Sequence, residues 1–408
     1  MLNFRRFIIL LLLPVIGCMH APRHEAEPEV PRIRALLKEV SGLDSVVFNG
    51  AYYLNSEEAS YEFGSKNNRI YLKPLDDGFK LFNENRVFLF REKDLVSFVS
   101  ENAEANFKLG GRTYSGNLIM VFTPEKKIMI INRVDLETYL TGVVPFEIAT
   151  HKDVLLDAVK AQSICARTYA ITKMKEREDI QFDVYADTRD QVYGGLGKQS
   201  ELSNRGISQT KGVVLMSGEK MATVYYHSTC GGMTESAGEV WPGVNKEYLA
   251  NRQDALGDHF ACETSPLFRW TEARTLDQID TLFARYFNKP FLNPIVTDTT
   301  DISFKAVISK RTPGSRVSEL QISYADTTFT LKGYEIRRFF AWPPGGYLQS
   351  NLFRLASAND STLLIEGGGS GHGVGMCQWG AMNMSENGFK YYHILSKYFP
   401  GTILKKVY

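Results

Sequence analysis

Short runs in which apolar and polar residues alternate dominate the chain from residue 40 to about residue 111. Runs such as SVVFNGAYYL and FKLFNENRVFLF have the two-residue period of a half-buried strand. Turn signals separate these runs, including Asp77-Gly78 and Gly110-Gly111. The pattern predicts a β-rich N-terminal region at 40–111. This region shows no grouping of catalytic or metal-binding residue types. We therefore assign it no function beyond that of a scaffold or a surface for a partner.

The segment from Ile131 to Ala170 has the pattern of a strand, a short helix, a turn and a long amphipathic helix. The long helix is expected over Asp153–Glu178, where apolar residues recur at the spacing of one helical face. Glu147 lies on the turn, two residues after Pro145. Because proline cannot continue a central strand, the carboxylate is expected on an irregular corner. Such corners often carry catalytic side chains, although a solvated turn residue has the same local sequence.

The last third of the chain predicts an α/β insertion at about 271–350, with a helix in TLDQIDTLFARYF and strands in DISFKAVISK and VSELQISY. After the insertion, the pattern predicts a strand, the glycine-rich loop 367–375, a helix ending at Gly388 and a short helix before Pro400-Gly401. The loop lacks the spacing of phosphate-binding loops. Its glycines allow close approach to a ligand or another segment, and His372 is expected to face whatever binds there.

Taken together, these patterns predict the α+β class, a mixed fold with a β-rich core and peripheral helices. The 408 residues suffice for one large or two moderate domains with buried cores. A formal net charge of +1, without a long basic run, gives no electrostatic signal for nucleic acid. We therefore expect no nucleic-acid partner.

The N-terminal end of the chain has the pattern of a secretory signal. Two arginines precede an apolar run from Phe7 to Gly17 that is too short to span a bilayer comfortably. The run ends in VIGC, which resembles the lipobox of bacterial lipoproteins, so Cys18 is expected to carry a lipid. An ordinary signal peptide, from which Cys18 is discarded, is the alternative. We expect a lipoprotein signal peptide at 1–18 and a polar linker at 19–39.

An exported location follows from this signal. The lipid would hold the mature chain on the periplasmic face of a bacterial membrane. Met19 is not the aspartate that retains many lipoproteins at the inner membrane, which favours the outer membrane.

Two cations lie on the predicted long helix. Lys160 and Arg167 are seven positions apart, about two helical turns, and so share one edge. A solvated basic stripe and an edge that faces an acidic group are both compatible with this spacing. The acidic group could be Glu147 or an anionic substrate.

The cysteines allow two interpretations. His227 and Cys230 have the spacing of half a zinc site, and Cys262 could complete it. In an oxidising compartment, a Cys230–Cys262 disulfide is the alternative. A histidine close to each cysteine, His259 in the second case, favours a structural zinc ion held by His227, Cys230 and Cys262. Cys165, within the long helix, is most simply a small buried residue.

Five segments of the chain resemble, in order, the stage II sporulation protein D family (the SpoIID/LytB domain). They are LETYLTGVVPFEI, LLDAVKAQSICARTYA, DTRDQVYGG, TVYYHSTCGGMTESAGEVW and GHGVGMCQWGAMNMSENGFKYYHIL. The resemblance covers about residues 112–270 and 331–403. It implies a SpoIID-like catalytic domain over 112–408, interrupted by the insertion.

The resemblance also implies roles for particular residues. The family's catalytic acid falls on Glu147, and its functional lysine and arginine fall on Lys160 and Arg167. Direct contact of either cation with Glu147 would lower the pKa that a general acid needs, so at least one is expected to face substrate. The substrate-binding residues expected are Lys160, Arg167, Gln191, Tyr193 and His372.

The activity implied is that of a peptidoglycan lytic transglycosylase. Such an enzyme cleaves MurNAc–GlcNAc bonds of peptide-free (denuded) glycan strands and leaves 1,6-anhydroMurNAc ends. One carboxylate suffices for this chemistry, and no cofactor is required. A basic edge would suit the lactyl carboxylates of stripped strands. The alternative is a non-catalytic glycan-binding module that enhances a partner amidase of the cell wall.

Overall fold

The computed structural model of this chain describes residues 29–56, 60–63, 68–100, 102–287, 304–324, 327–342, 346–359 and 362–408. The predicted signal peptide, Cys18 and the first part of the predicted linker lie outside the described residues. Among the helices that are described, none combines the length and the apolar character needed to cross a membrane.

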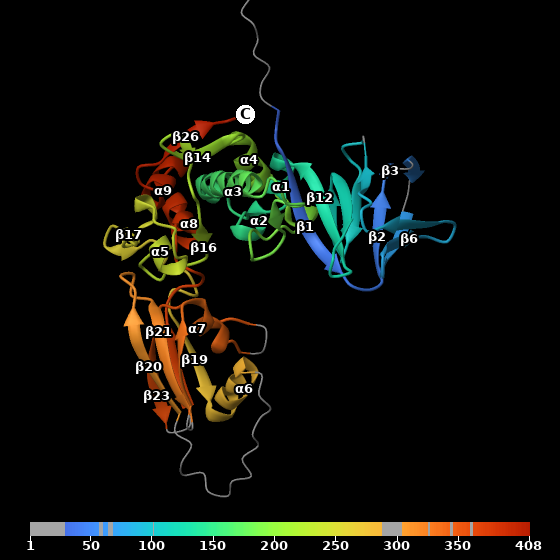
Figure 1. The fold of residues 1–408 in the computed structure, drawn as a ribbon. Coiled ribbons are helices and arrows are strands. Elements are labelled where there is room, and N and C mark those ends of the chain that lie inside the picture. The colour runs from blue at the N-terminus through green and yellow to red at the C-terminus, as the bar shows by residue number, and fades with distance from the viewer. Residues whose placement is uncertain are drawn as a thin grey trace, which may run out of the picture.

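Strands from the first 185 residues form a seven-stranded sheet with the order β13-β1-β12-β11-β8-β3-β4 (Figure 1). Its strands are β1 (Arg32–Val40), β3 (Tyr52–Asn55), β4 (Ser60–Phe63), β8 (Val96–Val99), β11 (Asn117–Phe122), β12 (Ile128–Asp135) and β13 (Val184–Tyr185).

A six-stranded sheet with the order β10-β9-β2-β5-β6-β7 accompanies it. Its strands are β2 (Asp44–Asn49), β5 (Asn68–Leu75), β6 (Gly78–Phe82), β7 (Val87–Arg91), β9 (Asn106–Leu109) and β10 (Arg112–Ser115). Apolar side chains of the two sheets share one core, in which the rings of Phe48 and Phe98 stack with centroids 4.5 Å apart. The alternating runs at 40–111 therefore do form strands, as predicted.

The linker predicted at 19–39 is wrong for its last residues, because Arg32–Val40 form β1. This strand pairs antiparallel with β12, from Arg32 opposite Asp135 to Val40 opposite Ile128. Its buried positions include Ile33 and Ala35, whereas the charged residues Arg32, Lys38 and Glu39 are exposed. Because of those charges, the polar composition of this segment resembled that of a linker.

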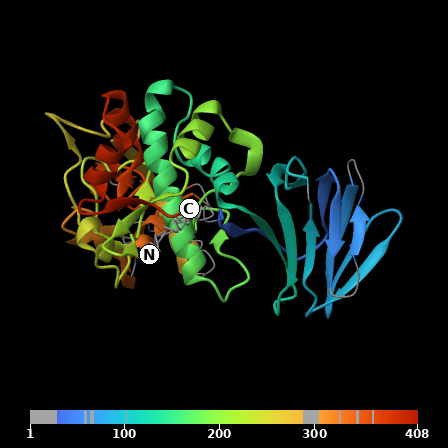
Figure 2. The same ribbon diagram turned by 90° about the horizontal axis from the view of Figure 1, so that it is seen from above.

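A helical part follows β12 along the chain. Its helices are α1 (Leu136–Thr141), α2 (Val144–Glu147), α3 (Leu156–Glu176), α4 (Glu201–Gln209), α5 (Ala237–Val240), α8 (Gln378–Glu386) and α9 (Tyr391–Tyr398). In both views α3 lies between the N-terminal sheets and the C-terminal helices (Figure 1, Figure 2). Most residues of α3 from Ala158 to Ile171 are buried, so this helix is central rather than amphipathic as predicted.

Short strands complete the helical part. They are β14 (Val213–Ser217), β15 (Lys220–Met221), β16 (Tyr226–His227), β17 (Ala255–Leu256), β18 (His259–Phe260), β25 (Met376–Cys377) and β26 (Ile403–Lys406). Strands β16 and β25 pair in parallel, and β17 with β18 forms a small hairpin. The pairing of β16 with β25 brings together segments about 150 residues apart in the sequence.

The predicted insertion forms a separate body with its own apolar core, in the lower part of Figure 1. Its elements are β19 (Trp270–Thr275), α6 (Leu276–Phe287), β20 (Phe304–Arg311), β21 (Val317–Tyr324), β22 (Thr327–Lys332), α7 (Tyr334–Phe339), β23 (Phe353–Asn359) and β24 (Thr362–Gly367). Because β19 pairs with β24, Trp270 opposite Gly367, the body extends beyond the predicted boundary at 350.

Arg316, at the tip of the β20–β21 hairpin, joins this body to the helical part. Its guanidinium donates to the carbonyl oxygens of Cys230 (2.9 Å) and Met233 (3.0 Å). The same guanidinium lies 3.9 Å from the buried Glu235 carboxylate, which also accepts a hydrogen bond from Thr312. The tip is thus inserted among buried polar groups of the helical part.

The glycine-rich loop 367–375 approaches other backbone segments closely, one of the two functions predicted for it. Gly375 has φ 71°, and a Cβ atom there would lie 2.2 Å from the carbonyl oxygen of Tyr225. Bridges join Ser370 to Thr229 and Val374 to Glu235. The loop therefore packs on the segment that follows β16. The α+β, β-rich class predicted from the sequence is confirmed.

Candidate active site

Glu147 is the last residue of α2, a single turn that begins beside Pro145. Proline is tolerated there because the first turn of a helix needs no backbone donor. The next residue, Ile148, is extended, so the carboxylate lies on the irregular corner that the sequence predicted. Its Oε1 accepts a hydrogen bond from the Val192 N–H at 3.2 Å, and its Oε2 accepts one from Gln378 Nε2 at 3.3 Å.

The surroundings of this carboxyl group favour its neutral form. Burial raises the pKa of Glu147, and the hydrogen bonds from Val192 and Gln378 offset this only in part. In the part of the chain that the structure describes, no lysine, arginine or histidine forms an ion pair with Glu147, whose partners are Val192 and Gln378. The residue as a whole is half-buried. A carboxyl group that keeps its proton at a higher pH than usual is what a general acid requires.

This raised pKa sets the sign of a stability effect. The folded chain holds the Glu147 proton more tightly than the unfolded chain, in which the ordinary value is 4.5. The stability associated with the neutral carboxyl is complete below pH 4.5 and is lost as the pH rises through the folded-state pKa.

Glu147→Gln, neutral at every pH, is therefore expected to raise the unfolding temperature at pH 7, and the gain should vanish below pH 4.5. Thermal unfolding of both proteins across this range measures the effect. A variant that is less stable than the wild type at pH 7 would contradict the raised pKa.

A buried hydrogen-bonded group supports the loop that delivers the Val192 N–H. The Tyr139 hydroxyl donates to Gln191 Oε1 (3.2 Å), and Gln191 Nε2 donates to the Tyr226 hydroxyl (2.8 Å) and the Ala166 carbonyl (3.3 Å). Gln191 is 1% exposed. The substrate-binding role predicted for Gln191 is therefore wrong, because its amide is already occupied by protein groups.

Tyr193 anchors the other side of the same loop. Its hydroxyl donates to Asn132 Oδ1 at 2.8 Å, and its buried ring packs against Tyr139 and Tyr114. The substrate-binding role predicted for Tyr193 is also wrong. The two side chains fix the loop, so that the peptide N–H between them points at Glu147.

Phe146 covers the loop from the side of α2. Its ring lies so close to Gly194 that a Cβ atom there would be 1.9 Å from Phe146 Cζ. Lys198 Nζ lies 4.6 Å from the centroid of the same ring. The glycine is needed for space, because its backbone is not in the left-handed region.

Gly194→Ala is expected to lower the free energy of unfolding by ~1–3 kcal/mol, since the added methyl group must displace Phe146 or the loop. Denaturant unfolding measures this change. Gly197→Ala is the matched control, because nothing lies within 4 Å of a Cβ atom at Gly197. Equal stability of the two variants would show that Phe146 does not need this space.

Arg167 is fully buried, so the predicted contact with substrate is wrong. Its Nε and Nη2 donate to the two carboxylate oxygens of Glu137 at 2.7 and 2.8 Å, and Nη1 donates to the Val213 carbonyl at 3.1 Å. The Tyr408 hydroxyl donates to Glu137 Oε1 at 2.6 Å. Arg167 thus ties α3 to α1, β14 and the end of the chain.

Lys160 does not share an accessible basic edge with Arg167. Its Nζ lies 5.7 Å from the ring centroid of Tyr391, at the start of α9, and the side chain is half-buried. Arg167 was expected beside it as a second substrate contact, but Arg167 is buried and cannot contact substrate there. A substrate contact of Lys160 stays a prediction.

His372 lies in an aromatic group with His227, Trp241 and Tyr225. Its ring centroid is 4.9 Å from that of Trp241 and 5.5 Å from that of His227, and Tyr225 stacks on Trp241. Burial lowers the pKa of both histidines, so they are neutral near pH 7. His372 retains some exposure. Its predicted contact with substrate stays a prediction.

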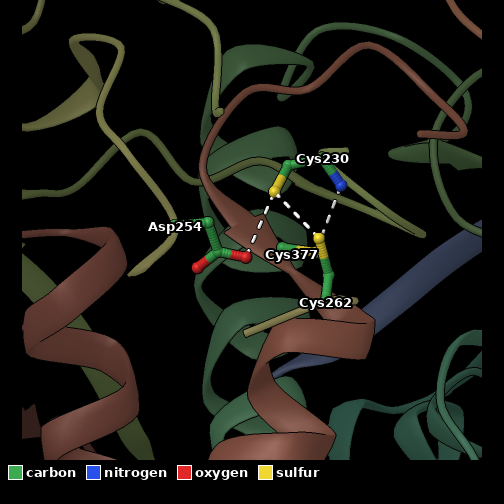
Figure 3. Close-up of side chains that lie close together, drawn as sticks. All are labelled: Cys230, Asp254, Cys262 and Cys377. Atoms are coloured by element: carbon green, nitrogen blue, oxygen red, sulfur yellow. Dashed lines mark hydrogen bonds between the residues drawn. The ribbon is translucent and has the colours of Figure 1, made fainter. Parts of the chain in front are cut away.

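Three cysteines and an aspartate form a buried cluster, with ligand atoms that all lie within 4.8 Å of one another (Figure 3). The members are Cys230, Asp254, Cys262 and Cys377. Sγ of Cys230 lies 3.3 Å from Sγ of Cys262, and the Cys230 thiol donates to Asp254 Oδ2 at 3.1 Å. The described cysteines are all free.

The ligand set predicted from HxxC spacing is therefore corrected. His227 does not belong to the cluster, because its Nδ1 lies 3.0 Å from the Val374 carbonyl oxygen and its ring faces His372. His259 is exposed and lies beside Glu263. Asp254 and Cys377 were not among the predicted ligands, because tertiary structure alone brings them to Cys230.

Gln378 and the Val192 N–H are the other functional groups that the sequence did not single out. Gln378 lies within the segment GHGVGMCQWG, and Val192 lies within DTRDQVYGG. A glutamine and a backbone donor carry no local signal that they face a distant carboxylate. What indicated their importance was that both segments belong to the ordered set that resembles the family.

Comparison with known proteins gives two matches to family models. The model described as stage II sporulation protein (SpoIID) matches residues 124–216, which include Glu147, α3 and Val192. A domain of unknown function (DUF8618) matches residues 250–375, which include Asp254, Cys262 and the separate body.

Three relatives illustrate the likeness over most of the chain. An uncharacterized protein of Brachyspira hyodysenteriae is 30% identical over 297 residues, 72% of this chain and 73% of that one. The amidase enhancer of Bacillus subtilis is 31% identical over 300 residues, 65% of this chain but 40% of the enhancer. Stage II sporulation protein D of the same species is 26% identical over 288 residues, 67% of this chain and 75% of that protein.

Proposed function

This chain belongs to the stage II sporulation protein D family, and we propose that it is a lytic transglycosylase acting on peptidoglycan glycan strands. The observation that carries the proposal is the state of Glu147. Its carboxyl group is held by two hydrogen bonds, its pKa is raised by burial, and it has no ion-pair partner among the described residues. The substrate class, denuded strands, comes from the sequence resemblance.

The chemistry requires one group that acts first as an acid and then as a base. The Glu147 carboxyl would protonate the glycosidic oxygen between MurNAc and GlcNAc, and the bond to the anomeric carbon would break. The Glu147 carboxylate would then accept the proton of the muramoyl 6-hydroxyl as its oxygen attacks that carbon. The products are a free GlcNAc hydroxyl and a 1,6-anhydroMurNAc end, and no water is consumed.

The nearby acids support a mechanism with one carboxylate. Glycoside hydrolysis usually uses two, about 5–10 Å apart. Glu137 is paired with Arg167, and Asp190 accepts hydrogen bonds from Arg177 (2.7 Å) and Tyr169 (2.7 Å). Both carboxylates are therefore occupied by structural cations, whereas Glu147 is not.

The alternative function is a glycan-binding module that stimulates a cell-wall amidase. The specific observation in its favour is the 31% identity to a protein named amidase enhancer, although the match covers 40% of that protein. The site around Glu147 would then hold glycan without cleaving it. Lys160 and His372 are the proposed substrate contacts in either case, and the partner amidase belongs to the alternative.

One experiment separates the two functions. Denuded glycan strands are incubated with the chain, bound strands are quantified, and the products are examined by mass spectrometry for anhydromuramoyl ends. Such ends support the transglycosylase, whereas binding without them supports the module. Equal binding to intact and denuded strands would remove the proposed contact between Lys160 and a lactyl carboxylate.

The location of the chain is a further proposal from the sequence. We propose export and anchoring through a lipid on Cys18, at the periplasmic face of the outer membrane. Incorporation of a labelled fatty acid, lost on Cys18→Ala, would test it.

A further inference from the structure

We propose that Cys230, Asp254, Cys262 and Cys377 bind a structural zinc ion, which fixes the start of α8 and so holds Gln378 against Glu147. The first evidence is the composition and spacing of the cluster. Three thiols and a carboxylate, all buried, lie with their ligand atoms within 4.8 Å of one another. Thiolate-rich, four-membered ligand sets of this kind are typical of closed structural zinc sites.

The spacing can accommodate the ion after a small expansion. Sulfur atoms bound to zinc at about 2.3 Å in a tetrahedron lie about 3.8 Å apart. The Cys230 and Cys262 sulfurs are 3.3 Å apart, so their separation would increase by about half an ångström. Figure 3 shows the four side chains converging from different segments of the chain.

Backbone donors surround the sulfur atoms. The Cys230 and Gly380 N–H groups point at Cys377 Sγ at 3.2 and 3.4 Å, and the Gly232 N–H points at Cys230 Sγ at 3.4 Å. Peptide donors of this kind stabilise thiolates. Gly232 has φ 102°, which favours glycine at this turn.

The carboxylate has the outer support that a metal ligand usually has. Asp254 Oδ1 accepts a hydrogen bond from the Tyr398 hydroxyl at 2.8 Å and lies 3.5 Å from Lys397 Nζ. This leaves Oδ2 facing the sulfur atoms. Three thiolates, a carboxylate and Zn²⁺ would carry a net charge of −2, which the Lys397 ammonium group partly compensates.

A disulfide explains the cluster less well. One bond would use two of the three sulfur atoms and leave a free thiol and a buried carboxylate beside it. An ion uses all four groups and protects the thiols in the oxidising compartment proposed for this chain.

The consequence for the active site follows from the place of Cys377. Its Sγ accepts the Gly380 N–H and so caps α8, and the next residue is Gln378, whose amide donates to Glu147. Asp254 and Cys262 stand at the two ends of the β17–β18 hairpin, which is too short to be stable alone. The ion would join this hairpin, β16 and α8 at one point.

The test is the zinc content of the full chain, purified without chelator. We expect one zinc per chain in the wild type, and less than about a tenth of that in Cys377→Ser and Asp254→Asn. Cys165→Ser is the matched control, because Cys165 is buried but lies outside the cluster. Chain without zinc, but with free thiols or with a Cys230–Cys262 disulfide by mass spectrometry, would overturn the proposal.

A second measurement covers variants that fail to fold. Wild-type chain stripped by chelator should unfold several degrees lower than the purified chain, and added Zn²⁺ should restore the difference, whereas Mg²⁺ should not. Identical unfolding temperatures with and without zinc would also overturn the proposal. Neither readout uses glycan, so failure of the proposed enzymatic function would leave the zinc result unchanged.

Discussion

Glu147→Gln is expected to reduce the formation of 1,6-anhydroMurNAc ends by ~10²–10⁴-fold while glycan binding persists. The amide cannot give a proton to the glycosidic oxygen or take one from the muramoyl hydroxyl. Its oxygen can still accept the Val192 N–H, which donates to Glu147 at 3.2 Å, so the loop should keep its place. Mass spectrometry of products from denuded strands measures the loss.

Asp187→Asn is the matched control for this substitution. Asp187 belongs to the same DTRDQVYGG segment, but it is exposed and pairs with Arg189. The control should retain product formation within about twofold, because a surface ion pair contributes little. Equal product formation by Glu147→Gln and the wild type would remove Glu147 from the proposed mechanism.

Arg167→Met is expected to lower the free energy of unfolding by ~3–5 kcal/mol, because it leaves the partly buried Glu137 carboxylate without its cation. Denaturant unfolding measures this loss. The double variant Arg167→Met with Glu137→Met should recover much of it, since the uncompensated charge is then gone.

The outcome also decides between two functions for Arg167. A buried ion pair predicts a loss of stability that the second substitution reverses. A substrate clamp, as inferred from the sequence, predicts weaker glycan binding at unchanged stability. The second result would contradict the burial of Arg167.

The local signals in the sequence were sufficient for some features and not for others. Pro145 placed Glu147 on a corner correctly, because the backbone restrictions of proline act within one or two residues. The alternation at 40–111 likewise predicted strands. Spacing put Lys160 and Arg167 on one helix edge, but it could not show that β14 and Tyr408 cover that edge near Arg167.

The cysteine cluster shows the same limit more sharply. Cys230 and Cys377 are 147 positions apart, and the parallel pairing of β16 with β25 brings them together. The nearby HxxC spacing predicted His227 as a ligand, yet its Nδ1 lies beside the Val374 carbonyl oxygen and its ring packs against His372. Closeness in sequence therefore predicted the wrong ligand, His227. The residue type, cysteine, correctly indicated which side chains belong to the cluster.

The contacts at the tip of the β20–β21 hairpin determine whether the separate body can be removed from this chain. The body from 270 to 367 has its own core and could pass for an exchangeable module acquired by insertion. Excising it would remove Arg316 and Thr312, so the buried Glu235 side chain would lose its cation and a hydrogen-bond donor. The Cys230 and Met233 carbonyls would lose the donors that Arg316 provides. The two parts therefore depend on each other, because buried polar groups of the helical part have their partners on the hairpin tip.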